Sequence, residues 1–107
     1  MKIPNIAQIR KCDAYTIENE PILSIDLMER AAKTCFEHLT SLFQKETTFL
    51  IFCGMGNNGG DGLALTRMLL EASYQAKAIV LFHKENFSID CQINFERLKN
   101  QFPQQIL

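Results

Sequence analysis

All five glycines of this 107-residue chain lie between Gly54 and Gly62. A nearly all-apolar run, Thr48–Cys53, precedes them, and an amphipathic stretch follows. This order predicts a buried strand, a glycine-rich turn and then a helix. Glycine clusters where the backbone needs positive φ angles or must approach a ligand closely. A glycine turn at a helix N-terminus presents free N–H groups and the positive end of the helix dipole, which predicts an anion site, most often for a phosphate.

The spacing of the glycines separates this loop from two common phosphate-binding motifs. Gly54, Gly56 and Gly59 fit the dinucleotide pattern G-x-G-x-x-G between a strand and a helix. The acid expected about 20 residues further on is missing, because the next acid after the second apolar run is the late Glu85. No Gly-Lys-Ser/Thr follows, which excludes a P-loop. The alternative is a tight turn without a ligand, although five glycines exceed what one turn needs.

Polar side chains within the turn suggest more than an anion cradle. Asn57, Asn58 and Asp61 add carbonyl and carboxylate oxygens, which suit a ribose, a cation or proton transfer. Each has a structural alternative. The asparagines tolerate left-handed backbone conformations, and Asp61 can offset the helix dipole from the first turn.

Four further residues near the loop have mainly structural interpretations. Arg67, nearly two turns beyond Asp61, is expected at the surface or paired with a carboxylate. Glu29 and Arg30 form a solvated helix pair or brace the loop. Met28 is expected in the core.

The apolar periodicity predicts an α/β chain with parallel strands. The first of its helices starts at Pro4-Asn5 and ends at Pro21, and the last carries Ile93, Phe95, Leu98 and Phe102 as its apolar residues. The strands should be covered on both faces, because they are almost continuously apolar. The other expected elements are a helix capped by Ser24 and running to about Gln44, a strand at Thr48–Cys53, a helix from about Gly60 to Ala72, a strand at Ala76–Phe82, and a helix capped by Ser88 and running to about Asn100.

The last residues predict the approach to a third strand. After Pro103, the run Gln104–Leu107 reads as a loop entering a strand. Two strands form a thin sheet for four helices. Either the chain, residues 1–107, is the N-terminal part of a longer domain, or its last residues or another subunit supply a third strand; the sequence favours the first.

Composition narrows the classes of function. The net charge is −1 with no basic block, which argues against a nucleic-acid or membrane partner. His38 and His83 lack metal-ligand spacing to each other or to cysteine. We see no secretory segment and expect a cytoplasmic protein whose thiols are reduced and mostly buried. The cysteines, which form no C-x-x-C pair, are Cys12, Cys35, Cys53 and Cys91.

Three runs together resemble one family. Gly56–Leu63, followed by Arg67, resembles the signature of the NAD(P)H-hydrate epimerases, of the YjeF N-terminal domain type. Leu27–Ala32 is similar to the second motif of that family, and Ile9–Ile17 to its first helix. The resemblance covers most of the chain, and the loop motif is the specific part.

The resemblance implies a fold, a reaction and a site. The fold would be a Rossmann-like three-layer α/β/α domain, here incomplete. Family members convert the R form of hydrated NADH or NADPH into the S form. A potassium ion would be held by Asn58 and by an aspartate of a later βα unit. The catalytic aspartate would also lie beyond Leu107, so Asp61 is the one proton-transfer candidate in this chain. The implied substrate-binding residues are Asn57, Asn58, Gly59, Gly60 and Asp61.

The sequence thus supports two functions of different kinds. The first is the loop-bearing part of an epimerase, inactive alone, whose functional partner is an NAD(P)H-hydrate dehydratase and which forms a homodimer through its first two helices. The alternative is a non-catalytic Rossmann-like module that binds a nucleotide or a protein. The sequence does not separate NADH from NADPH forms of the substrate.

Overall fold

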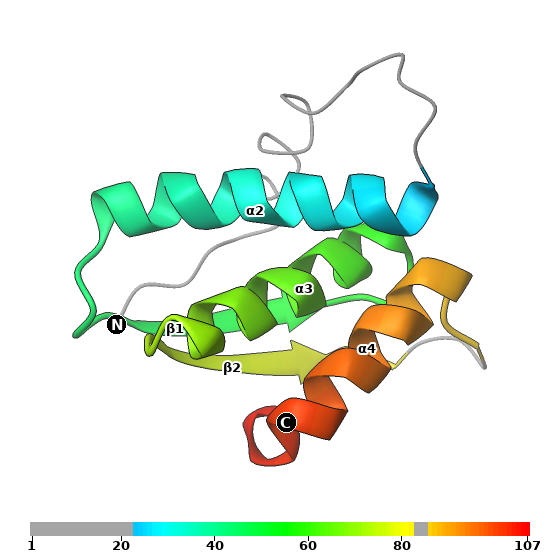
Figure 1. The fold of residues 1–107 in the computed structure, drawn as a ribbon. Coiled ribbons are helices and arrows are strands. Elements are labelled where there is room, and N and C mark those ends of the chain that lie inside the picture. Colours follow the sequence, from blue (N-terminus) through cyan, green and yellow to red (C-terminus); the bar gives the residue numbers. More distant parts are fainter. Residues whose placement is uncertain (1–22, 83–85) are drawn as a thin grey trace.

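A computed structural model describes residues 23–82 and 86–107 (Figure 1). The predicted first helix, from Pro4 to Pro21, and the resembling run Ile9–Ile17 lie outside these residues. The described elements are α2 (Ser24–Leu42), β1 (Thr48–Cys53), α3 (Asn57–Glu71), β2 (Gln75–Val80), α4 (Ile89–Gln101) and the short 3-10 helix η1 (Pro103–Gln105).

The two strands form a parallel pair joined by α3. Their register runs from Thr48 opposite Gln75 to Cys53 opposite Val80. The predicted strand Thr48–Cys53 is confirmed. The second strand was predicted at Ala76–Phe82 and is found slightly earlier in the chain, at Gln75–Val80. This strand–helix–strand unit confirms a Rossmann-like α/β arrangement, and α3 is packed on the sheet between α2 and α4 (Figure 1).

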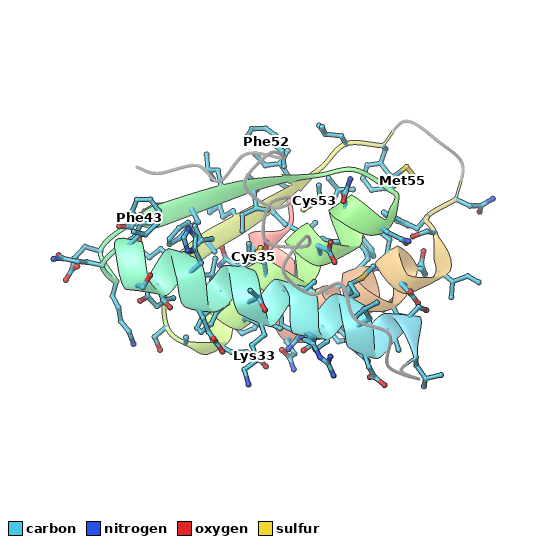
Figure 2. All side chains as sticks on the ribbon, turned by 90° about the horizontal axis from the view of Figure 1, so that it is seen from above. Lys33, Cys35, Phe43, Phe52, Cys53 and Met55 are labelled. Carbon is cyan, nitrogen blue, oxygen red and sulfur yellow. The ribbon has the colours of Figure 1, made fainter. Side chains whose placement is uncertain are left out.

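The helices cover one face of the sheet. Residues on that face alternate along both strands and are buried: Phe49, Ile51, Cys53, Ala76, Ala78 and Val80. The alternate positions face the other way, and Phe52 is 40% exposed there. Figure 2 shows its ring projecting away from the helices. Burial on both faces, expected from the apolar runs, is therefore not found within residues 23–82 and 86–107.

Helix α3 begins three residues before its predicted start at Gly60. Gly56 is the N-terminal cap, and the N–H of Gly60 donates to the carbonyl of Gly56 over 3.0 Å. Low helix propensity made the glycine-rich stretch look like loop, but packing outweighs propensity here. Every residue of α3 from Gly59 to Thr66 is buried, so this part of the helix forms the centre of the described fold.

The predicted caps had different outcomes. Ser24 is the first helical residue of α2, Leu23 occupies the cap position, and no side chain caps that helix. Ser88 does cap α4, since its Oγ accepts a hydrogen bond from the N–H of Cys91 over 3.3 Å. Helix α2 ends at Leu42 rather than Gln44, because Phe43 already has extended backbone angles.

The last described residues lie beside β2. Ile106 forms an isolated parallel bridge with Ala78, and the N–H of Leu107 donates to the carbonyl of Ala78 over 2.8 Å. A third segment of the chain therefore pairs with the edge of β2 through this one bridge. No helix within the described ranges is long and apolar enough to cross a membrane.

Candidate functional site

The glycine-rich stretch owes its composition to close packing. No described glycine has a positive φ, so the expectation of left-handed glycines is wrong. At Gly59, a Cβ atom would lie 1.9 Å from the carbonyl oxygen of Gly54. At Gly60, it would lie 2.7 Å from Sδ of Met28. The close approach expected from the sequence was to a ligand, and that stays a prediction. The atoms that exclude a Cβ at these two glycines belong to neighbouring parts of the chain.

Asn57 and Asn58 are the first two residues of α3, and both are exposed. Neither has a positive φ, because Ser73 is the one non-glycine residue with such an angle in the part of the chain described. The left-handed explanation for the asparagines is therefore wrong. Ser88 Oγ donates to Asn57 Oδ1 over 3.0 Å, which ties the start of α3 to the start of α4.

The helix start leaves backbone donors for a ligand. The N–H groups of Asn57, Asn58 and Gly59 precede the first helical hydrogen bond of α3, which Gly60 makes. They lie at the positive end of the helix dipole. The anion site expected at this helix start therefore stays a prediction.

Asp61 is buried, with 7% of its surface exposed. It is the fifth residue of α3, whose first turn contains no acidic residue. The interpretation of Asp61 as a first-turn charge that offsets the dipole is therefore wrong. Its charge acts instead on Cys91 of α4, which places a carboxylate and a thiol near each other behind the helix start.

The thiols beside the loop are held in the neutral form. Burial, and then the charge of Asp61, raise the pKa of Cys91 to about 11. Burial, and then the neighbouring Cys91, raise the pKa of Cys53 to about 12. The neutral thiol of Cys91 donates to the carbonyl of Gly54 over 3.8 Å. Cys35, Cys53 and Cys91 are buried thiols, as predicted; Cys12 lies outside the described residues.

Arg67 is paired with carboxylates, as the sequence predicted. Its Nη2 donates to both oxygens of Glu29 on α2, and its Nη1 donates to Glu71 over 2.9 Å. Its side chain is 11% exposed, and Arg97 lies 3.8 Å from Glu29. Glu29 therefore joins α2 to α3 rather than standing solvated on its own helix.

A hollow of about 420 Å³ lies over this ion pair and not over the glycine loop. It is lined by Glu29, Arg67, Arg97, Asn100 and Gln101. Glu29 of α2 pairs with Arg67 of α3 and lies 3.8 Å from Arg97 of α4, so these contacts join three helices. We therefore assign the hollow to the packing of the helical layer.

Met28 and Asn94 complete the surroundings of the loop. Met28 is in the core as predicted, with Sδ against Gly60. Asn94 was missed: the apolar residues expected in α4 were Ile93, Phe95, Leu98 and Phe102. Of these Leu98 is buried, and the other buried residues of the helix are Cys91 and Asn94. The signal was their spacing of three and four residues, which places Asn94 on the apolar stripe.

The fold and the loop define a Rossmann-like α/β domain with a glycine-rich turn at a helix N-terminus. Residues 24–104 match the family described as YjeF-related protein N-terminus, and the chain belongs to this family.

Curated relatives share most of the chain. It is 35% identical over 99 residues to the bifunctional NAD(P)H-hydrate repair enzyme Nnr of Moorella thermoacetica, covering 90% of this chain and 19% of that protein. It is 32% identical to the NAD(P)H-hydrate epimerase of Anaerococcus prevotii, covering 92% of this chain and 44% of the relative. It is 37% identical to that of Oenococcus oeni, covering 87% and 45%. The chain thus spans about half the length of these two epimerases.

Proposed function

We propose that this chain carries the substrate-binding loop of an NAD(P)H-hydrate epimerase, which interconverts the R and S forms of hydrated NADH and NADPH. The observation that carries the proposal is the start of α3, where backbone donors stand one turn from the buried carboxylate of Asp61. The names of the epimerase relatives support it.

The chemistry of the reaction agrees with this half-site. Epimerising a carbon that bears a hydroxyl and an amine needs no redox change. It needs an anchor for the pyrophosphate and groups that donate and accept protons near the ring. The N–H groups of Asn57, Asn58 and Gly59 supply the anchor, and Asp61 supplies one proton-transfer group. Gly60 lets the helix start pack closely enough to hold this arrangement.

Potassium fits one of the residues present. The side-chain oxygen of Asn58 is a suitable ligand for a hard cation, and its exposure leaves it accessible. Among the described residues no group of three or more His, Cys, Asp or Glu side chains could hold a metal ion. On the strength of its exposed amide oxygen, we propose Asn58 as one potassium ligand. The ion would supply positive charge for a substrate phosphate.

The proposal extends to partners and location. The relatives from Moorella thermoacetica and Salinibacter ruber are named bifunctional NAD(P)H-hydrate repair enzymes, which supports a dehydratase as the functional partner. Formation of a homodimer and a cytoplasmic location remain predictions from the sequence.

The test is an Asp61→Asn substitution in the protein that contains the complete chain. We expect turnover of the R form to fall by about 10²–10⁴-fold, the usual contribution of a positioned acid or base, while the melting temperature stays near wild type. Asp26→Asn, on the exposed first turn of α2, is the matched control and should leave turnover unchanged. Near-normal turnover by Asp61→Asn would remove Asp61 from the site.

A nucleotide-binding module is the second candidate. Asp61 is the one buried carboxylate among residues 23–82 and 86–107, whereas epimerisation needs both a donor and an acceptor of protons. Tight binding of ADP-ribose by a wild-type protein that does not turn over the R form would favour this candidate.

A further inference from the structure

Asn94 is a buried polar residue in the middle of α4, with 1% of its surface exposed. Its Nδ2 donates to Sδ of Met28 over 3.0 Å and to the carbonyl of Asp90 over 3.3 Å. Its Oδ1 is buried and has no hydrogen-bond partner. The amide orientation follows from these contacts, since the opposite one would set Oδ1 against the Asp90 oxygen.

Stability does not explain an asparagine at this position. A thioether is a weak acceptor, and the Asp90 carbonyl belongs to the hydrogen-bond ladder of α4 itself. A buried acceptor without a partner opposes folding. Leucine has a similar size and needs no hydrogen bond, so it would suit this stripe of α4 at least as well.

The contacts of Asn94 lead to the glycine loop. Met28 Sδ lies 2.7 Å from the position of a Cβ at Gly60, in the first turn of α3. The Cα of Cys91, one turn before Asn94, lies 3.1 Å from the same position. Helices α2 and α4 thus enclose the backbone at Gly60, and Asn94 joins them through the sulfur of Met28.

We propose that Asn94 is a positioning residue of the loop: through Met28 it fixes the backbone at Gly60, and with it the N–H groups that receive the phosphates. This inference rests on the proposed function, in which the start of α3 binds a dinucleotide. A directed hydrogen bond orients the flexible methionine, whereas leucine at position 94 would leave the sulfur free to change rotamer.

The test compares Asn94→Leu, Met28→Leu and the double variant in the complete chain. We expect Asn94→Leu to weaken binding of ADP-ribose at least tenfold, measured by calorimetry, while its melting temperature equals or exceeds that of wild type. Met28→Leu keeps the volume but removes the acceptor, so its loss should be similar. The double variant should lose no more than either single one, because both remove the same contact.

The outcomes separate this inference from the proposed function. Failure of wild type to bind ADP-ribose contradicts the proposed function. Wild-type binding matched within twofold by Asn94→Leu overturns the positioning role alone. If Asn94→Leu does not fold, Met28→Leu takes its place in the test. An affinity of Met28→Leu for ADP-ribose equal to that of wild type would also overturn the positioning role. The amide NMR spectrum provides a test that needs no ligand. We expect the amide chemical shifts of Gly56–Gly60 to change in Asn94→Leu. Unchanged shifts would overturn the inference, whether or not the wild-type protein binds ADP-ribose.

Discussion

The fold leaves no room for a side chain at Gly59. A Cβ there would lie 1.9 Å from the Gly54 carbonyl oxygen, whereas one at Gly56 would meet nothing within 4 Å. Gly59→Ala should therefore destabilise the protein by more than about 3 kcal/mol, beyond usual overpacking, because backbone has to move. Gly56→Ala should cost about 1 kcal/mol or less, through the cap position. Urea denaturation of both variants makes the comparison, and equal losses would contradict it.

The buried thiols should make stability depend on alkaline pH. The pKa values of Cys91 and Cys53 are raised from 9.0 to about 11 and about 12. Above pH 9 the unfolded chain loses these protons before the folded chain does. The stability present below pH 9 should therefore fall between pH 9 and 12, by up to about 1.4 kcal/mol per pH unit for each thiol. Denaturant titrations across this range test the slope, and Cys91→Ala should reduce it; an unchanged slope would show that Cys91 does not contribute.

The candidate residues that sequence reasoning selected and those that it overlooked differ in what draws attention to them. Asn57, Asn58 and Asp61 stood out because polar residues in a glycine turn have few structural reasons to be there. Asn94 and Cys91 did not, because their importance comes from contact with Met28 and Gly54, on segments distant in the sequence. Such contacts follow from how the helices pack, which the periodicity of one helix does not specify.

At the scale of the element, Ser88 joins two helix starts. Its Oγ accepts from the N–H of Cys91 and donates to Asn57 Oδ1. Ser88→Ala should destabilise the protein by about 0.5–2 kcal/mol, the usual cost of a lost cap. Ser24→Ala is the matched control, since no side chain caps α2, and should stay within about 0.5 kcal/mol. Thermal denaturation checks both, and a loss at Ser24 as large as that at Ser88 would contradict the assignment.

Element bounds were predictable where one physical signal dominated. The strand Thr48–Cys53 was correct because its apolar run is bounded by polar residues before it and by the glycine-rich stretch after it. The predicted start of α3 was wrong because two effects oppose each other there. The low helix propensity of glycine disfavours a helix, and tertiary packing favours it more strongly. Ser24 and Ser88 look alike in sequence, yet one lies inside its helix and the other caps one.

At the scale of the whole molecule, the sequence predicted the parallel strand pair and the helices packed on it. It did not predict that the described helices cover one face of the sheet. Apolar strands were expected to be buried on both faces, but Phe52 projects from the face that no described helix covers (Figure 2). The bridge from Ile106 to Ala78 places a third parallel segment beside β2. Both features depend on how separate layers and segments pack together. The residue pattern within one strand does not determine that packing.

The contact between Asn94 and Met28 also bears on the order of events during synthesis. The two residues are separated by 66 positions, so their contact forms only after α4 has left the ribosome. The unit β1–α3–β2 is built from nearer contacts, which form with smaller loss of chain entropy. The glycine turn would thus exist in the nascent chain before its supports arrive. We infer that the start of α3 reaches its final packing late, when α4 closes over a largely assembled sheet.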